Sequence, residues 1–270
     1  MRILVTGDKG FIGFHLIRKL SKGHYVVGFD IKDGPEKDVR KLDNLLNSSK
    51  NVDVIVHLAA LCIHPESVEK PLEYLTTNIL GTINVLEVAR RLKIKKIINM
   101  SSAGFGLTSP YAISKLFGEQ LCELYSKLYG INIVTLRIFN AYGEGNDKGV
   151  INKFFSAIKS NKPVTIHGDG EYVRDYVYVK DIVNIIKKII EKNLGSGTYE
   201  VGTGIGTDVN ELIKIMERVT GKKMEVKHEP LSYDIIKFSV AKKSVVKNPI
   251  KLEVGLKELW KSFIKGDIDK

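Results

Sequence analysis

Cysteine is scarce in this 270-residue chain, which contains only two. Cys62 follows a predicted strand and Cys122 lies on a predicted helix, and their spacing fits neither a metal-ligand motif nor a redox motif. We therefore expect both to be reduced packing residues of a cytoplasmic protein.

Long apolar runs are absent as well, and no stretch approaches the length that a bilayer requires. Met1-Arg2 leads directly into a predicted strand, so we expect neither a signal nor a transit segment. His15, His24 and His64 are dispersed, which predicts no metal site. A Gly-x-Ser-x-Gly motif is also missing, which argues against a serine hydrolase.

Acidic residues are fewer than basic ones, 31 against 42, and the formal net charge is +11. Such a balance is compatible with nucleic-acid binding. The lysines, however, occur as scattered pairs such as Lys95-Lys96 and Lys187-Lys188, without a basic stripe or an interleaved aromatic platform. We expect neither a nucleic-acid nor a membrane partner; a positive field would instead attract an anionic small substrate.

The hydrophobic pattern alternates between strands and helices over the first half of the chain. Strands are predicted at 2–5, 25–29, 53–58, 96–100 and 132–139, and helices at 11–20, 74–92 and 111–129. The apolar run within residues 53–58 is continuous enough for a strand that is buried on both faces of a parallel sheet. The fold class is therefore α/β, a Rossmann-type doubly wound parallel sheet with a smaller C-terminal α/β substrate lobe.

The pattern changes after about Gly143. A short strand at 199–201 and helices at 208–219 and 252–264 follow glycine-rich turns. We place the cofactor domain at 1–142 and the substrate lobe at 143–270, with residues 172–190 as a segment that returns to the first domain. A Pro- or Ser-rich linker is lacking, so we expect the two parts to share an interface.

Gly7, Gly10 and Gly13 form a G-x-x-G-x-x-G turn between a buried-type strand and a helix. The first glycine permits a tight turn, the second a close approach to a pyrophosphate, and the third close packing of helix on strand. Asp30 ends the next strand, near the position that binds a ribose 2′-hydroxyl. Its carboxylate would repel a 2′-phosphate, which favours NAD over NADP. Gly202-Thr203-Gly204-Ile205-Gly206 also follows a short strand, but lacks this context.

Tyr111 and Lys115 lie one helical turn apart, directly after Ser101-Ser102 at a strand end where ligands bind in such sheets. An ammonium and an oxidised nicotinamide would favour the phenolate and lower the pKa of Tyr111, making it a base. Either serine could hydrogen-bond the substrate oxygen. The same spacing occurs at Tyr176/Lys180 and Tyr233/Lys237, without the preceding serines. His57 ends a buried-type strand and is predicted to be structural.

Together these residues resemble the extended short-chain dehydrogenase/reductase superfamily, and within it the nucleotide-sugar epimerases and dehydratases. The similarity also includes His57-Leu58-Ala59-Ala60, the segment from Thr77 to Thr82, the segment from Leu136 to Gly143, Gly168-Asp169-Gly170, and the segment from Val173 to Val179.

This resemblance implies roles for individual residues. Catalysis would use Ser102, Tyr111 and Lys115. Substrate would be bound by Ser101, Ser102, Asn140 and Arg174, with assistance from Lys237; amide and guanidinium donors suit diphosphate oxygens. NAD would be contacted by Gly7, Gly10, Phe11, Ile12, Gly13, Asp30, the adenine-binding pair Asp38-Val39, Leu58, Ala59, Ala60, Asn78, Tyr111 and Lys115. The family also commonly forms homodimers.

Three departures from the family pattern bear on function. The stretch between Asp30 and Asp53 is short, which predicts that a helix and a strand are trimmed. The stretch between Ser102 and Tyr111 is also short, which leaves the identity of the sugar open. The loop from Ser101 to Gly106 is one residue short. Counting from the strand end favours Ser102 as the catalytic hydroxyl, whereas counting back from Gly106 favours Ser101; we prefer Ser102.

The leading hypothesis is NAD-dependent epimerisation of a nucleotide sugar, of the UDP-glucose/UDP-galactose 4-epimerase type. A nucleotide-sugar 4,6-dehydratase or reductase on the same scaffold is the second. The third is a binding protein that retains the cofactor but no longer catalyses. The complete set of Ser102, Tyr111 and Lys115 argues against the third.

Overall fold

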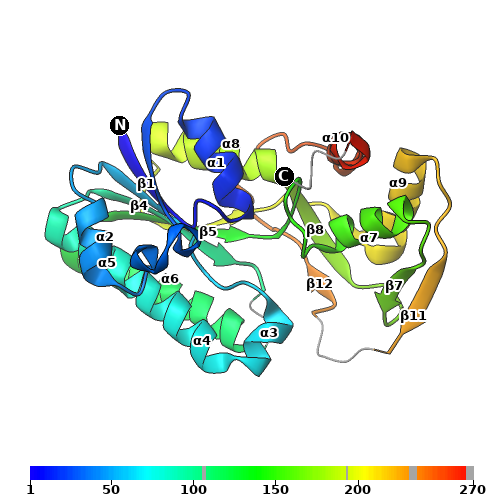
Figure 1. Ribbon diagram of the computed structural model, residues 1–270, viewed down its shortest axis with the longest axis horizontal. Helices are drawn as coiled ribbons and strands as arrows, with labels where there is room; N and C mark the ends of the chain where they lie inside the picture. The colour runs from blue at the N-terminus through cyan, green and yellow to red at the C-terminus, as the bar shows by residue number, and fades with distance from the viewer. Residues whose placement is uncertain (105–107, 193, 231–235, 266–270) are drawn as a thin grey trace. The chain divides into compact units, whose positions relative to one another are not determined.

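The computed structural model describes residues 1–104, 108–192, 194–230 and 236–265 (Figure 1). The chain forms two compact units. The first contains Met1–Ile138 together with Val183–Tyr199, and the second contains Phe139–Ile182 and the chain from Glu200 onward. The segment that returns to the first unit thus begins later than the 172 expected from the sequence, because the strand at 173–178 pairs within the second unit.

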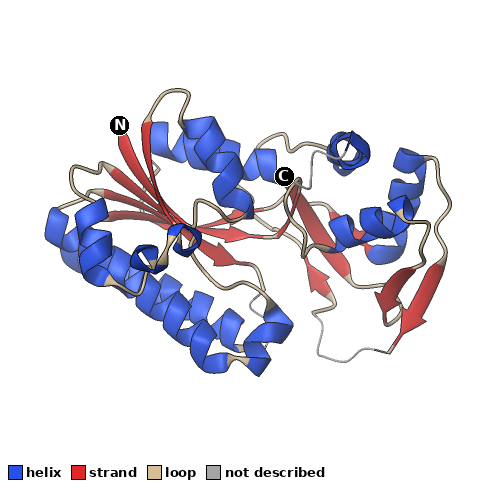
Figure 2. Ribbon diagram, in the orientation of Figure 1, coloured by secondary structure: helices blue, strands red, loops and turns tan. Residues whose placement is uncertain are grey.

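The first unit is built on a six-stranded sheet in the order β2-β1-β3-β4-β5-β9 (Figures 1 and 2). The pairings of its first five strands are parallel. The strands are β1 (Arg2–Thr6), β2 (Tyr25–Phe29), β3 (Val54–His57), β4 (Lys96–Ser102), β5 (Asn132–Ile138) and β9 (Gly197–Val201). The strand expected at 199–201 in the substrate lobe is therefore the last strand of this sheet.

Helices cover both faces of this sheet, as a doubly wound fold requires (Figure 1). On one face lie α1 (Phe11–Leu20) and α8 (Val179–Glu191). On the other lie α2 (Leu42–Ser48), α5 (Gly81–Leu92) and α6 (Pro110–Tyr129), with the short α3 (His64–Glu69) and α4 (Pro71–Leu75) beside α6. The predicted parallel α/β sheet is confirmed.

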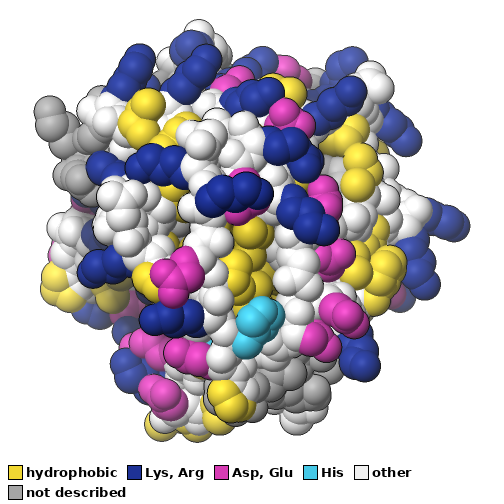
Figure 3. Space-filling view, turned by 90° about the vertical axis from the view of Figure 1, so that its right-hand side faces the viewer, with side chains coloured by type: hydrophobic (Ala, Val, Ile, Leu, Met, Phe, Trp, Pro, Cys, Tyr) yellow, Lys and Arg dark blue, Asp and Glu magenta, His cyan; other side chains and the backbone are white. Residues whose placement is uncertain are grey.

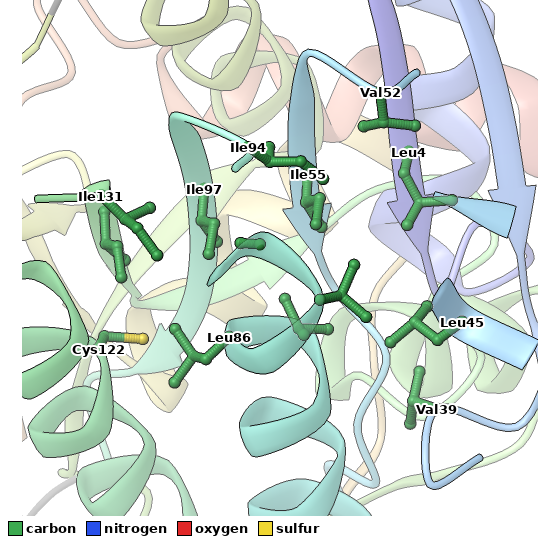
Figure 4. Packing of buried hydrophobic residues seen from close by; sticks show 14 of the residues in the cluster. Leu4, Val39, Leu45, Val52, Ile55, Leu86, Ile94, Ile97, Cys122 and Ile131 are labelled. Atoms are coloured by element: carbon green, nitrogen blue, oxygen red, sulfur yellow. The ribbon is translucent and has the colours of Figure 1, made fainter. Parts of the chain in front are cut away.

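A continuous apolar core joins the second face of the sheet to α2 and α5 (Figure 4). Leu4, Ile55 and Ile97 come from three neighbouring strands, and Leu45 and Leu86 pack on them from the helices. All five are at most 1% exposed. Burial of this apolar surface holds the strand ends, and therefore the loops that follow them, in fixed positions.

The helix expected at 74–92 is interrupted by a π-helical turn at Thr76–Leu80, between α4 and α5. Such turns alter the direction of side chains and often occur at functional sites. Here Asn78 points away from the helix and hydrogen-bonds Leu61 and Ser114. The helical periodicity alone does not reveal this interruption.

The segment between β2 and β3 is as compact as its length predicts. It contains two 3₁₀ turns, Ile31–Asp33 and Pro35–Lys37, followed by the two-turn helix α2. None of the described residues between β2 and β3 adds a strand to the sheet.

The second unit contains a small sheet in which β8 pairs with β6, β10 and β12, and a separate ribbon of β7 with β11. The strands are β6 (Asn140–Tyr142), β7 (Val164–His167), β8 (Val173–Tyr178), β10 (Gly206–Asp208), β11 (Val226–Glu229) and β12 (Phe238–Ser239). The helices are α7 (Val150–Lys159), α9 (Val209–Thr220) and α10 (Leu252–Lys265). Asp208, expected inside a helix, instead caps α9 by accepting a hydrogen bond from Glu211 N.

No helix in the described parts of the chain is both long and apolar enough to span a membrane. The face drawn in Figure 3 carries lysine and arginine side chains interspersed with acidic and apolar ones. That face therefore shows no single basic patch.

Candidate active site

The glycine turn has the geometry that a bound pyrophosphate requires. Gly7 has a φ of +73°, and a Cβ atom on it would lie 2.6 Å from Ala59 N. A Cβ atom on Gly13 would lie 2.2 Å from Gly7 O, so helix α1 can approach the turn only with glycine there. Gly10 is the N-cap of α1 and has no side-chain cap, which leaves the N–H groups of Phe11 and Ile12 for an anion.

Asp30 directly follows β2 beside this turn and is 7% exposed. Its Oδ2 accepts a hydrogen bond from Lys9 N at 3.0 Å, and its Oδ1 accepts one from Lys32 N at 2.9 Å. Both bonds fix the carboxylate in the glycine turn, the position expected for a ribose-binding acid.

The predicted adenine pair is also held in place. Arg40 donates from its backbone N and from Nε to Asp38 Oδ1 at 2.9 and 3.0 Å, and from Nη2 to Oδ2 at 2.6 Å. Burial opposes ionisation of Asp38, but these hydrogen bonds outweigh it and lower its pKa. Asn84 Nδ2 donates to Val39 O at 2.9 Å, which ties the pair to α5.

Leu58, Ala59 and Ala60 follow β3 and pass directly beside Gly7. Leu58 N donates to Thr6 O at 3.0 Å and Ala59 N to Thr6 Oγ1 at 3.3 Å. His57 is buried between Thr6 and Thr82, with ring nitrogens 2.8 and 3.2 Å from their hydroxyls. Burial lowers the pKa of His57 to about 3, so this histidine is neutral and structural, as predicted.

Asn78 connects the loop after β3 to helix α6. Its Oδ1 accepts from Leu61 N at 2.9 Å, and its Nδ2 donates to Leu61 O at 3.0 Å and to Ser114 Oγ at 2.9 Å. The side chain is 2% exposed and its amide is already engaged. In this structure Asn78 therefore positions the elements that surround the predicted cofactor site.

The two serines at the end of β4 face opposite sides of the sheet. Ser101 is 5% exposed, and its Oγ has no hydrogen-bond partner among the described residues. Ser102 instead hydrogen-bonds the hydroxyl of Tyr111, and its Oγ also accepts from Gly104 N at 3.2 Å. Strand β4 continues through both serines, which supports the choice of Ser102, made by counting from the strand end, as the proposed catalytic hydroxyl. Phe105 and Gly106, used in the opposing count, lie outside the described residues.

Tyr111 stands in the first turn of α6, which Ser109 caps by accepting from Ala112 N at 3.1 Å. Burial is the largest influence on Tyr111 and raises its pKa to about 12, despite the hydrogen bond from Ser102. Lys115 Nζ donates to Met100 O at 2.9 Å, and burial lowers the pKa of Lys115 to about 8. Lys115 alone therefore does not lower the pKa of Tyr111, and the lowering expected when the oxidised nicotinamide is also bound stays a prediction.

Cys62 differs from the packing role expected for it. It is exposed, whereas Cys122 is buried as predicted. Burial raises the pKa of the Cys122 thiol to about 12. The loop that carries Cys62 is held on both sides, at Leu61 by Asn78 and at Ile63, whose N donates to Tyr74 Oη at 3.2 Å.

Two other Tyr/Lys pairs share the spacing of Tyr111 and Lys115. In the pair Tyr176/Lys180, the lysine forms an ion pair with Glu258. In the pair Tyr233/Lys237, Tyr233 lies outside the described residues.

Asn140 and Arg174 belong to the small sheet of the second unit, and Lys237 directly precedes its strand β12. Asn140 pairs with Tyr176 in the β6–β8 register, and Arg174 pairs with Ser239. Val173 N donates to Lys237 O at 2.8 Å, and Arg174 Nη1 donates to Ile236 O at 2.6 Å. The sheet therefore gathers three segments that are far apart in the chain.

Asp175 was missed by the sequence reasoning, although it stands next to Arg174. Its carboxylate is completely buried and accepts from Thr203 N at 2.7 Å, from Gly204 N at 2.8 Å and from Ala241 N at 3.2 Å. Two N–H groups of the glycine-rich turn at 202–206, those of Thr203 and Gly204, therefore donate to Asp175 and are not available to a phosphate. The signal in the sequence was an acid at an inward-facing strand position.

Outside comparisons place this geometry in a known class. Residues 3–202 match the NAD dependent epimerase/dehydratase family. Because this match covers most of the chain, the protein belongs to that family, and NAD is its cofactor. In the described residues, no group of three or more histidine, cysteine or acidic side chains could hold a metal ion.

The similar proteins include epimerases and a dehydratase. A putative UDP-glucose 4-epimerase of Methanocaldococcus jannaschii is 32% identical over 95% of both chains. The crystal structure of a UDP-glucose 4-epimerase with UDP-glucose, from Thermotoga maritima, has a TM-score of 0.92 at 30% identity and covers 98% of this chain and 99% of that one. An NAD-dependent NDP-hexosamine 5,6-dehydratase has a TM-score of 0.90 at 25% identity and covers 100% and 99%.

Proposed function

We propose that this protein is a nucleotide-sugar 4-epimerase that interconverts a UDP-hexose such as UDP-glucose with its 4-epimer, UDP-galactose. The observation that carries the proposal is the group formed by Ser102, Tyr111 and Lys115 at the carboxyl end of β4. Tyr111 and Ser102 share a hydrogen bond, and Lys115 is anchored one helical turn away. The relatives named above support the substrate class.

In this proposal Tyr111 accepts the proton of the sugar 4-hydroxyl, and Ser102 holds the same oxygen by a hydrogen bond. Bound oxidised NAD supplies the hydride acceptor and a positive charge beside the phenol. That charge is needed because burial raises the pKa of Tyr111 to about 12. Lys115, held by Met100 O, adds an ammonium one turn along α6. The 4-keto sugar would take the hydride back from the cofactor on the opposite face of C4, and Tyr111 returns its proton to the 4-oxygen, which gives the 4-epimer.

The residues after Ser102 favour epimerisation over dehydration. A 4,6-dehydratase must eliminate water across C5 and C6, which requires a further acid and base above the sugar. Ala103 and Gly104 stand directly after Ser102 and cannot transfer protons. Ala103 N is engaged by Ile138 O at 3.0 Å, so this segment is held to β5. Epimerisation needs no additional acid here.

Asn140 and Arg174 are proposed to bind the diphosphate of the substrate, with assistance from Lys237. Two observations support this proposal. One small sheet carries Asn140 and Arg174, and Lys237 is hydrogen-bonded to it through Val173 N. The buried Asp175 ties the strand that carries Arg174 to the turn at Thr203. Guanidinium and amide N–H groups are suitable donors for phosphate oxygens.

Proton NMR of the sugar distinguishes the two reactions. The enzyme is incubated with NAD and UDP-glucose, and in parallel with UDP-galactose. We expect each hexose to be converted into the other. A 4-keto-6-deoxy sugar without interconversion of the hexoses would show a dehydratase instead. Tyr111→Phe serves as the inactive control.

A further inference from the structure

Asp8 is a half-buried carboxyl group in the glycine turn that no step of the proposed mechanism uses. It lies between Gly7 and Lys9 and packs against β2: a Cβ atom on Gly28 would lie 2.4 Å from Asp8 Oδ2 and 2.9 Å from Oδ1. Glycine at position 28 therefore leaves the room that this carboxylate occupies. Asp8 Oδ1 is buried and has no hydrogen-bond partner within the described residues.

Two other carboxylates near Asp8 are already engaged. Asp30 accepts the N–H groups of Lys9 and Lys32. Asp33 forms ion pairs with the ammonium groups of Lys9 and Lys37. Of these three carboxylates, Asp8 has an oxygen, Oδ1, without a hydrogen-bond partner in the described residues.

The charges around Asp8 act on its ionisation in both directions. Burial is the largest influence and raises the pKa of Asp8, and Asp30 and Asp33 raise it further. The backbone N–H of Asp8 and the Lys37 ammonium lower it. The Lys9 ammonium also interacts with Asp8. A carboxyl in such a setting gains from a neutral hydroxyl donor and loses from another anion.

The cofactor brings both kinds of group to this turn. The adenosine ribose of NAD carries hydroxyl donors, and in folds of this type they bind the acid at the end of the second strand, which is Asp30 here. NADP carries a 2′-phosphate in place of one hydroxyl, and a phosphate offers only acceptors and negative charge. The orphan oxygen of Asp8 thus matches NAD and opposes NADP.

We propose that Asp8 is a second ribose-binding carboxylate, which accepts a hydrogen bond from the adenosine ribose and repels a 2′-phosphate. It therefore determines, together with Asp30, that the enzyme selects NAD over NADP. The inference rests on the cofactor site of the proposed function, but it concerns dinucleotide binding alone. Asp8 has no part in the sugar chemistry.

The test compares the dissociation constants of NAD and NADP for wild type and Asp8→Asn by isothermal titration calorimetry. We expect Asp8→Asn to bind NAD about tenfold more weakly, as for loss of a charge-assisted hydrogen bond. It should bind NADP more tightly, so the NAD/NADP selectivity falls by more than tenfold. Asp53→Asn is the matched control, because it removes the same charge at the opposite end of the parallel strands and should leave the selectivity unchanged.

The same titrations at lower pH provide a readout that a packing role would not change. As pH falls through the raised pKa of Asp8, its charge is lost and the wild-type selectivity for NAD should decrease. The 2′-phosphate and the other ionisable groups of the site are the same in both proteins. Any pH dependence of the NAD/NADP selectivity that wild type shows and Asp8→Asn lacks is therefore due to the ionisation of Asp8.

Gly28→Ala is the second variant, because its methyl group would displace the Asp8 carboxylate without changing its charge. We expect the same loss of selectivity, and this variant carries the test where Asp8→Asn fails to fold. Unchanged selectivity and pH dependence in the folded variants would overturn the inference and leave Asp8 a packing residue. A wild type that binds NAD selectively yet shows no epimerisation would instead contradict only the proposed function.

Discussion

At the scale of single residues, burial decides how Tyr111 behaves as a base. The protein alone raises its pKa to about 12, so the phenol keeps its proton at neutral pH until a positive charge lies beside it. The pKa of Lys115, by contrast, is lowered to about 8, and its Nζ donates a hydrogen bond to Met100 O. We therefore expect Tyr111 to lose its proton only when the cofactor is bound beside it.

Tyr111→Phe should abolish turnover while it leaves NAD affinity within a few-fold of wild type. Loss of a positioned proton acceptor should reduce kcat by at least ~10²–10⁴-fold. Tyr129→Phe, at the exposed end of the same helix, is the control and should retain its rate. Steady-state kinetics and cofactor titration measure both effects. A near-normal rate in Tyr111→Phe would remove this residue from the mechanism.

His57 predicts how stability responds to acid. Its pKa is about 3 in the folded state and about 6.5 when unfolded, so between these values the unfolded chain binds an additional proton. The stability contributed by neutral His57 is complete above pH 6.5 and declines as pH falls toward 3. The free energy of unfolding should lose about 2 kcal/mol from this group between pH 7 and pH 5.

Urea denaturation of wild type and His57→Gln at pH 9, 7 and 5 measures this contribution. The two proteins should show similar pH dependence between pH 9 and 7, where histidine is neutral in both states. Below pH 7 the slope should be steeper in wild type. Equal slopes below pH 7 would mean that His57 is able to ionise in the folded protein.

At the scale of elements, the start of helix α6 positions the proposed catalytic side chains. Ser109 caps the helix, and Pro110 follows at its first position, where proline is favoured. Tyr111 is the next residue, so the conformation of the first turn determines where its phenol lies. Lys115 follows one turn later and reaches back to β4.

Ser109→Ala should reduce the free energy of unfolding by about 1 kcal/mol, as is typical of a lost N-cap. Turnover should fall as well, because the first turn of α6 would fray around Tyr111. Ser109→Thr keeps the capping hydroxyl and should preserve most of both properties. Thermal unfolding and kinetics on the three proteins test this. A stable and fully active Ser109→Ala would show that packing alone positions the turn.

At the scale of the whole molecule, helix α6 exposes an apolar stripe. Ile113, Phe117, Leu124 and Leu128 follow helical spacing and are between 43% and 62% exposed. Apolar side chains gathered in this way on one helix are typical of an association surface. We therefore retain the prediction of a homodimer in which α5 and α6 of two copies pair as a four-helix bundle.

Light scattering at micromolar concentration should give twice the 30.2 kDa mass of the chain. Leu124→Lys should shift the protein toward the monomer. Val254→Lys, which alters an exposed apolar residue of α10, should not. A wild-type mass of 30.2 kDa throughout would contradict the dimer.

Much of the first unit follows from the sequence by itself. Apolar residues recur every two residues in a strand and every three to four in a helix, so a short stretch of sequence is enough to predict these elements. The spacing of Gly7, Gly10 and Gly13 predicts the cofactor turn for the same reason, and Tyr111 and Lys115 share a face because a helix turns every 3.6 residues. These properties depend on neighbours along the chain.

Other properties were decided only by the tertiary structure, because they depend on groups distant in sequence. Ser102 rather than Ser101 meets Tyr111 because strand β4 continues to its second serine before α6 packs on it. The raised pKa of Tyr111 comes from burial, which no local pattern measures. Asp8 acquires its orphan oxygen by packing against Gly28, a residue of the next strand. Burial and contacts between strands are products of the completed fold, and they assign each side chain its chemistry.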